Sequence, residues 1–428
     1  MNKIEFYKET NFKQTPIGKI PRDWKIVRLK DIALISSGNT APQEKRYFED
    51  GKFPFIRVQH LNKLEEQKYI TQFDLINELA ISELKLKKFR KGSIIFPKSG
   101  ESIRLEKRAI LREDSFVVNH LAVIEPIHQE AHNMFLFYYL CTIKTSDYIT
   151  KTTMPSLNLS TIQTFYIPLP PVAEQRAVAE VLSVVDLAIQ KTDMVIAKTE
   201  RLKKGLMQTL LTKGIGHKEY KVTEIGRIPK EWEVVRLRDV VNTKKGKKPE
   251  KLEEEWKENY LPYLTADYFR TGKPKQFVKL EAETSYITVG ENDVIFIWDG
   301  SNAGDVFTGL KGVLASTMVV INPKESLTLT KQFLFYFMKT KFELFNSKTT
   351  GSTIPHVSKS LYENLLIPLP PLPEQQKIAE ILSTIDKKLE LEKKRKEKLE
   401  RIKKGLMNDL LTGKRRIPQE MWEKIGGE

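Results

Sequence analysis

The sequence predicts an α+β (mixed α/β) protein in which two pseudo-symmetric globular domains are separated by a pair of long antiparallel coiled-coil helices. Three observations support this prediction. The chain repeats itself after about 200 residues. Each copy carries short β-forming runs bounded by turn residues, which is typical of strands. Each copy then ends in about 43 residues whose apolar positions lie three and four apart, which is typical of a helix.

The repeat covers nearly the whole chain. "TPIGKIPRDWKIVRLKDI" from Thr15 matches "TEIGRIPKEWEVVRLRDV" from Thr223. "IPLPPVAEQRAVAEVL" from Ile167 matches "IPLPPLPEQQKIAEIL" from Ile367, and ten of the sixteen positions are identical. Two long copies do not make a solenoid, but they can pack about an internal two-fold axis. We therefore expect a first globular domain, a first long helix, a second globular domain, a second long helix and a C-terminal tail at 1–170, 171–214, 215–370, 371–414 and 415–428.

The two globular copies share a frame and differ in their loops. In the first copy we expect strands in "FPFIRV", "GSIIFP" and "FVVNHLAVI", and in the second in "LPYLTA", "DVIFIWD" and "STMVVINP". "HNMFLFYYLCTI" and "TKQFLFYFMKTKFELF" read as packed helices. The loop "SSGNTAPQEKRYFEDG" faces "TKKGKKPEKLEEEWKEN" in the alignment. Loops on a rigid scaffold carry function, so this pattern suggests one operation on two different ligands; neutral drift of surface loops is the alternative.

The two long helices begin after a proline-rich segment, where proline is tolerated. Glu174 and Glu374 fall in the first turn, where acidic residues favour the helix dipole. An exposed apolar seam would not be stable, so we expect the helices to pair as a coiled coil about 60 Å long. The predicted seam residues are Leu182, Val185, Ile189, Leu206, Leu210, Leu382, Ile385, Leu389, Leu406 and Leu410.

Charge and composition bound the function. Lys and Arg outnumber Asp and Glu by 71 to 55, and the net charge of +16 favours a polyanionic partner such as nucleic acid, although a lysine-rich surface is the alternative. The one cysteine, Cys141, excludes a disulfide framework within one chain. No run of about 18 apolar residues occurs, so we expect no membrane span and a cytoplasmic protein.

Several catalytic motifs are missing. The chain lacks G-x-x-x-x-G-K-[ST] and G-x-G-x-x-G before a helix, and it lacks the Asn/Asp-Pro-Pro-aromatic loop of an amino-methyltransferase. The six histidines form no recognisable triad or metal site. We therefore expect no catalytic residues and no metal in this chain, which indicates a reader or organiser.

The repeated motif resembles a known family. "IPLPPxxEQxx[IV]Ax[VI]L" at 167–182 and 367–382, followed by a helix ending in "R[LI]KKGLMxxLLT", is similar to the specificity (S) subunit of type I restriction–modification enzymes. "IPxxWx[VI]VRL[KR]D[IV]" at 20–32 and 228–240 resembles the start of its target-recognition domains. The resemblance covers about residues 15–414.

The resemblance implies a function. Each target-recognition domain would read one half of a bipartite site in double-stranded DNA, and the helices would set the spacer between the halves. The helices would also dock two methyltransferase (M) subunits, and restriction (R) subunits would complete the enzyme. This chain would then be a non-catalytic specificity subunit without a cofactor of its own, while DNA methylation and restriction by the partner subunits would use S-adenosylmethionine, ATP and Mg.

Candidate DNA contacts come from the polar loops, because Arg and Lys can read guanine or hold phosphate and Asn can read adenine. Surface solvation is the alternative for each residue. The first domain offers Asn39, Arg57, His60, Lys98, Ser99, Arg104 and Lys107. The second domain offers Lys244, Lys247, Asp267, Tyr268, Arg270, Ser301 and Asn302.

Two other functions remain open at this point. The chain could be a coiled-coil scaffold that joins two protein ligands without DNA specificity. It could also be an autonomous nuclease or methyltransferase, against which the missing motifs count.

Overall fold

The computed structural model describes residues 5–65, 68–127, 130–149, 155–280, 286–325, 328–349 and 355–426. The chain divides into two compact units. The first unit holds Met1–Val195 with Glu392–Glu428, and the second holds Ile196–Leu391. Each unit therefore contains one globular domain together with a segment of each long helix.

The first unit is built on a six-stranded sheet beside a three-stranded one. Its central strands are apolar at nearly every position because both faces are buried. The larger sheet has the order β5 (Ala33–Ser37), β13 (Leu121–Pro126), β10 (Ile94–Pro97), β11 (Ala109–Ile110), β8 (Tyr69–Ile70), β7 (Leu64–Glu65). The smaller has the order β12 (Phe116–Val117), β6 (Phe53–Ile56), β9 (Asp74–Ile76). The helices are α1 (Leu29–Ile32), α2 (Glu78–Glu83), α3 (Asn133–Leu140) and α4 (Leu159–Gln163).

The second unit repeats this frame with two four-stranded sheets. The register is shared: Phe96 of β10 lies opposite Ala122 of β13, and Phe296 of β22 lies opposite Val319 of β25. One sheet has the order β18 (Val241–Lys245), β25 (Met318–Pro323), β22 (Val294–Ile297), β23 (Val306–Phe307), and the other β20 (Phe277–Lys279), β19 (Tyr260–Leu264), β24 (Gly312–Leu314), β21 (Thr288–Val289). The helices are α6 (Leu237–Val240), α7 (Ala266–Thr271), α8 (Lys331–Lys339), α9 (Phe342–Ser347) and α10 (Lys359–Glu363).

Three expected segments are shorter than their sequence patterns. Strand β6 ends at Ile56, because the chain turns into a 3-10 helix at Val58–Asn62. "FVVNHLAVI" forms two strands that are separated by a turn at Asn119 and His120. The expected helix at 330–345 is divided into α8 and α9 at Thr340 and Lys341.

Short strand pairs connect the globular domains to the helices. The pair β4 (Lys25–Arg28) with β14 (Tyr166–Leu169) has its counterpart in β17 (Glu233–Arg236) with β26 (Leu366–Leu369). Hairpins precede both: β2 (Phe12–Thr15) with β3 (Gly18–Pro21), and β15 (Tyr220–Thr223) with β16 (Gly226–Pro229). In the first unit β1 (Tyr7–Lys8) also pairs with β27 (Arg415–Arg416), which joins the two ends of the chain.

Residues 415–428 are predicted to form a separate C-terminal tail, but their described part, residues 415–426, belongs to the first unit. Ile417 is fully buried, and Trp422 at the start of α12 (Trp422–Gly426) packs against the same core as α3. The Trp422 indole donates to the Ile417 carbonyl at 2.8 Å. The C-terminal segment therefore completes the first unit.

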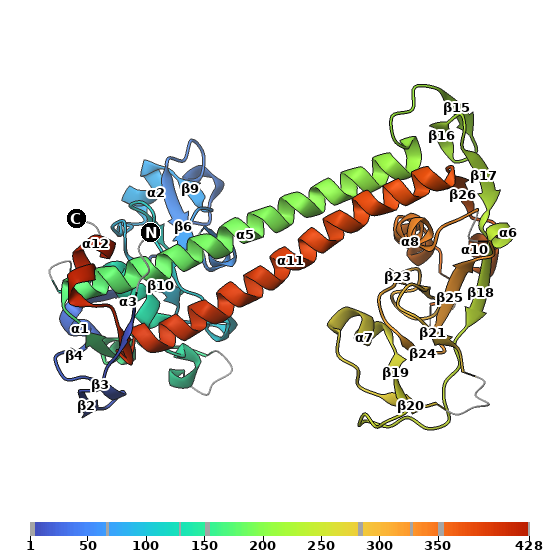
Figure 1. Ribbon diagram of the computed structural model, residues 1–428. Helices are drawn as coiled ribbons and strands as arrows, with labels where there is room; N and C mark the ends of the chain where they lie inside the picture. Colours follow the sequence, from blue (N-terminus) through green and yellow to red (C-terminus); the bar gives the residue numbers. More distant parts are fainter. Residues whose placement is uncertain are drawn as a thin grey trace. The chain divides into compact units, whose positions relative to one another are not determined.

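The long helices are α5 (Val172–Lys213) and α11 (Leu372–Leu410). In the first unit Asp186 pairs with Lys403 and Asp193 with Lys396, so the partner number falls as the α5 number rises. This correspondence makes the helices antiparallel, and Figure 1 shows them running side by side (green and red). The predicted fold of two repeated α+β domains and two paired antiparallel helices is thus confirmed.

Candidate functional site

A buried glutamine anchors each globular domain to the start of its long helix. Gln175 is fully buried; its side chain accepts from the His132 amide at 2.8 Å and donates to the Pro170 carbonyl at 2.9 Å. Gln375 is equally buried; it accepts from the Thr330 amide at 2.9 Å and donates to the Pro370 carbonyl at 2.8 Å. The repeated "EQ" thus fixes the loop before α3 or α8 against the helix start.

The glutamate before each glutamine binds a tryptophan. The Trp24 indole donates to Glu174 at 3.1 Å, and the Trp232 indole donates to Glu374 at 2.8 Å. Both tryptophans are fully buried. Buried polar groups need such partners, so the "IPxxW" and "EQ" motifs are two halves of one contact. We call these contacts the first joint (Trp24, Glu174, Gln175) and the second joint (Trp232, Glu374, Gln375).

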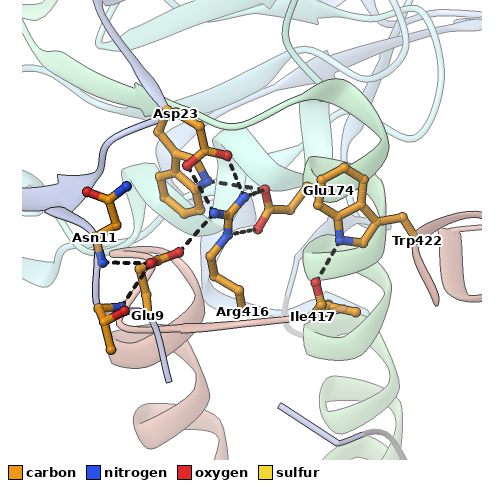
Figure 2. Close-up of polar contacts among 9 residues, drawn as sticks. Glu9, Asn11, Asp23, Glu174, Arg416, Ile417 and Trp422 are labelled. Atoms are coloured by element: carbon orange, nitrogen blue, oxygen red, sulfur yellow. Dashed lines mark hydrogen bonds and ion pairs between the residues drawn. The ribbon is translucent and has the colours of Figure 1, made fainter. Parts of the chain in front are cut away.

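The chain that leaves the opposite helix supplies a polar side chain to each joint. In the first joint Arg416 forms two hydrogen bonds to Glu174, at 2.8 and 2.9 Å, and two to Asp23 at the same distances. Arg416 also donates to Glu9 at 3.0 Å, as Figure 2 shows. Burial raises the pKa of Glu174, while Arg416 and Trp24 act in the opposite direction.

The second joint has a histidine at this place. His217 Nε2 lies 2.8 Å from Glu374, and the Ile215 amide donates to the same carboxylate at 2.8 Å. The glycine just after each helix, Gly214 or Gly413, has a positive φ, and a Cβ there would lie within about 3 Å of Trp232 or within 2.4 Å of Pro21. Glycine therefore allows the helix end to approach the joint closely.

Three of the candidate DNA contacts in the first domain have side chains that form hydrogen bonds to other groups of the protein. The Asn39 side chain binds the backbone of Lys87 in both directions. Arg57 donates to Asp74 at 2.5 Å, and His60 accepts from the Arg57 amide at 3.0 Å. These contacts hold the three side chains in the loops, where Asn39 and Arg57 are half-buried and His60 is buried.

Of the other four candidates in this domain, Arg104 is exposed and the rest are half-buried. Ser99 bonds the His120 ring at 2.6 Å, and Arg104 pairs with Glu101 at 2.9 Å. Lys107 donates to Asn62 at 2.5 Å, while Lys98 is half-buried at the end of β10.

A polar hollow in the first domain contains residues that the sequence analysis missed. The hollow has a volume of about 460 Å³ and lies between the loops at 40–43, 57–59 and 118–120. Amides and an imidazole at such a place can read base edges. Its exposed polar residues are Thr40, Gln43, Gln59, Asn119 and His120. The loop comparison pointed to this region, but not to these positions.

The candidates of the second domain are mostly exposed. Asp267 pairs with Lys275 at 2.8 Å, and Arg270 approaches Asp305 at 3.4 Å. Tyr268 packs partly against the domain core. Exposed Lys244 borders another hollow of about 460 Å³ with Asn242 and Asn322. The remaining candidates Lys247, Ser301 and Asn302 lie on exposed or half-buried loops.

Equivalent turns in the two domains carry different chemistry. In the first domain Ser99 faces Ser156 across an isolated bridge, and in the second Asp299 faces His356 in the same way. Asp299 lies 2.6 Å from the His356 ring and 2.9 Å from Lys245 Nζ. The sequence analysis missed this Lys245–Asp299–His356 cluster, although the repeat offset of 200 aligns Ser99 with Asp299 and Ser156 with His356.

The predicted seam residues face inward on both helices. Six of them are buried: Leu182, Ile189, Leu210, Leu382, Leu389 and Leu410. The others are half-buried: Val185, Leu206, Ile385 and Leu406. Buried Thr192 and Thr199 continue the same spacing of three and four on α5.

Neither a metal cluster nor a membrane span is found where the chain is described. Within those residues no three His, Cys, Asp or Glu side chains could hold a metal ion. Of the helices described, none is long and apolar enough to cross a membrane.

Comparison with known proteins gives two matches along the chain to one family. The Type I restriction modification DNA specificity domain matches residues 21–198 and again residues 229–401. The two matched segments cover both globular domains and most of both helices.

One relative matches over the full length, and another matches over part of it. The putative type I restriction enzyme MjaX specificity subunit of Methanocaldococcus jannaschii is 30% identical over 97% of this chain and 99% of its own length. The MjaVIII specificity subunit of the same organism is 46% identical over 44% of this chain and 43% of its own length. The solved S subunit of the M. genitalium type I restriction–modification system has a TM-score of 0.59 at 17% identity, over 96% of this chain and 100% of that one.

Proposed function

The chain belongs to the type I restriction modification DNA specificity family, and we propose that each of its domains reads one half of a bipartite DNA target while the helical pair sets the spacer between the halves. As a specificity subunit of a type I restriction–modification system, the chain selects DNA and is not itself an enzyme.

The observation that carries this proposal is the repeated frame with exchanged loop chemistry. The sheet register and the Trp–Glu and Gln contacts of the joints are the same in both domains, whereas the turn after β10 carries Ser99 and the turn after β22 carries Asp299. A serine can donate and accept, but a carboxylate only accepts and is suited to the cytosine amino group. Two domains with one frame and different polar turns would read two different half-sites.

The net charge of +16 supports DNA as the ligand. Membership of the family implies DNA and the other subunits of the system as partners. The finer assignment is our proposal: two methyltransferase subunits dock on the helical pair, and restriction subunits complete the complex. S-adenosylmethionine, ATP and Mg would be used by those partners, and the complex would work in the cytoplasm, where its DNA is found.

The test is a methylome of cells that express the complete system with and without this chain. We expect a bipartite motif that disappears with the chain. Asp299→Ala and His356→Ala should then change one half-site only, and His120→Ala and Gln59→Ala should change the other. A lost bidentate base contact would reduce discrimination at one position by about 1–3 kcal/mol. A change in both half-sites after substitution in one domain would contradict the proposal.

The spacer is tested by inserting one heptad after residue 195 and another after residue 395. Seven helical residues add about 10 Å, which corresponds to about three base pairs of B-DNA. Whole heptads keep the seam facing the partner helix. We expect a longer spacer and unchanged half-sites, and an unchanged spacer would rule out the helices as the spacer-setting element.

The two alternative functions make different predictions. A scaffold without DNA specificity would leave the methylome unchanged when loops are exchanged. An autonomous enzyme would cleave or methylate DNA as a purified chain. Family membership favours neither.

A further inference from the structure

Each unit contains a polar cluster in which one carboxylate of a long helix binds the globular domain and the other long helix at once. In the first unit Asp186 of α5 accepts from the Tyr138 hydroxyl of α3 at 2.7 Å and pairs with Lys403 of α11 at 2.5 Å. In the second unit Asp386 of α11 accepts from the Tyr336 hydroxyl of α8 at 2.9 Å and pairs with Lys203 of α5. We call these the first and second Asp–Lys–Tyr clusters.

We propose that Asp186 and Asp386 determine how strictly the chain selects its spacer length, by holding each recognition domain at one fixed position along the helical pair. This inference rests on the proposed function of the helices as the spacer-setting element. It goes further, because it names the side chains that fix the position of each domain along the helices.

The first argument is that the clusters select one register. If the antiparallel helices slipped by one heptad in one direction, Asp186 would face Leu410 and Asp386 would face Leu210. If they slipped in the other direction, Asp386 would face Ile196, while Asp186 would face Lys396. A buried charge without a partner is strongly unfavourable, so the register that places Asp186 against Leu410 is disfavoured most, and the other register removes only the cation of the more exposed Asp386. A polar residue in an apolar seam fixes register in this way, at some cost in stability.

The second argument is that the tyrosines add the domain to the same contact. Burial raises the pKa of both Tyr138 and Tyr336, so each hydroxyl keeps its proton and donates to the aspartate. A buried hydrogen bond to a charged group is stronger than one between neutral groups and has a narrow geometry. A domain that moved along the helices would lose this bond and leave the aspartate underpaired.

A third ion pair provides an internal control. Asp193 of α5 pairs with Lys396 of α11 at 2.7 Å, one heptad along from the first cluster. This pair is more exposed, and where the structure describes the chain it joins the helices alone. It therefore shares the helix–helix charge contact with the clusters but lacks the domain contact.

The clusters also differ from one another. Lys68 from the first domain is fully buried with its Nζ 4.0 Å from Asp186, whose side chain is 1% exposed. The Asp386 side chain is 35% exposed. We therefore expect the first cluster to hold its domain more strictly than the second.

The experiment uses the complete system and a plasmid library that carries both half-sites at spacers from three base pairs shorter to three longer than the native one. Methylation of each spacer is read by sequencing. Tyr138→Phe and Asp186→Asn should raise the methylation of spacers one base pair from the native length about tenfold relative to the native spacer. Tyr336→Phe and Asp386→Asn should have the same effect to a smaller extent, and Asp193→Asn should have none.

Unchanged spacer discrimination in Tyr138→Phe and Asp186→Asn would overturn the inference, and so would an equal loss in Asp193→Asn. Tyr138→Phe keeps the ring and its packing, so it serves where Asp186→Asn fails to fold. The heptad insertion separates the two proposals. If the insertion moves the spacer while the cluster variants stay strict, only the inference fails; if it does not move the spacer, the proposed function of the helices fails.

Discussion

The two joints make the same contact with different covalent connections. In the second joint α5 continues through Gly214 and His217 into the second domain. In the first joint the partners are far apart in the sequence, because Arg416 follows α11 and binds residues that lie before and after the first domain. Arg416 binds Glu9, Asp23 beside Trp24, and Glu174 at the start of α5, which are 407, 393 and 242 residues away.

This difference shows two ways to form the same joint: in the second joint His217 and Trp232 lie close together in the sequence, and in the first joint Arg416 and Trp24 lie far apart. An imidazole with one carboxylate suffices where the backbone holds the partners together. In the first joint the backbone does not hold the partners together. The Arg416 guanidinium with three carboxylates and the strand pair β1–β27 hold them instead.

The substitution with the largest expected effect on the difference between the joints is Arg416→Ala. The substitution leaves Glu174 buried beside Asp23 and Glu9 without a cation, and breaking a buried ion pair from one side costs about 3–5 kcal/mol. We expect faster hydrogen exchange in Tyr7–Lys8, in α12 and at the start of α5, with little change in the second unit. An equal loss in both units would contradict the assignment of Arg416 to the first joint.

Substitution of the glutamines tests the contacts that the two joints share. Gln175→Ala and Gln375→Ala each leave a buried backbone amide and carbonyl unpaired, which costs about 1–3 kcal/mol per group. Because the two side chains make the same contacts, we expect equal losses of about 2–3 kcal/mol in their respective units by hydrogen exchange. Glu174→Gln and Glu374→Gln form a matched pair of variants. Because Arg416 binds Glu174 whereas His217 binds Glu374, these two variants should again distinguish the joints.

The histidine of the second joint is expected to matter less. His217→Ala removes one hydrogen bond, but Glu374 keeps the Trp232 indole and the Ile215 amide. We expect the free energy of unfolding of the second unit to fall by about 1–2 kcal/mol. The measurement is urea unfolding monitored by hydrogen exchange. If His217→Ala reduced stability as much as Arg416→Ala does, the backbone connection in the second joint would not reduce the need for side-chain contacts there.

The smallest expected effect is a pH dependence of the first unit. Glu106 bonds Thr145, Ser146 and Arg108, and these contacts outweigh burial and lower its pKa to about 2 from 4.5. Because the folded-state pKa is depressed, this contribution is complete above pH 4.5 and is lost as the pH falls toward 2.

We expect about 1 kcal/mol from this group after allowing for its partial exposure. Glu106→Gln should remove that part of the acid dependence in the first unit. The aligned position in the second unit is Val306, so the second unit provides the comparison. An acid profile that Glu106→Gln leaves unchanged would argue against this contribution.

The sequence predicted the frame well, because the frame depends on local patterns. The strands around Phe96 and Phe296 and the heptad seam from Leu182 to Leu210 follow from apolar spacing alone. The candidate DNA contacts were harder to predict, because residue type does not reveal where a side chain is used. Asn39 and His60 are engaged by backbone groups that other elements bring close, and a sequence pattern does not contain those neighbours.

The repeat by itself determined that this chain has two domains, two paired helices and two similar helix starts. Periodicity and identity are local properties, and they survive in the sequence without a structure. Only the tertiary structure decided that Glu174 receives Arg416, that Glu374 receives His217, and that Asp186 and Asp386 join a domain to both helices. Those partners lie far apart in the chain, and their pairing depends on burial and distance, which the fold alone creates.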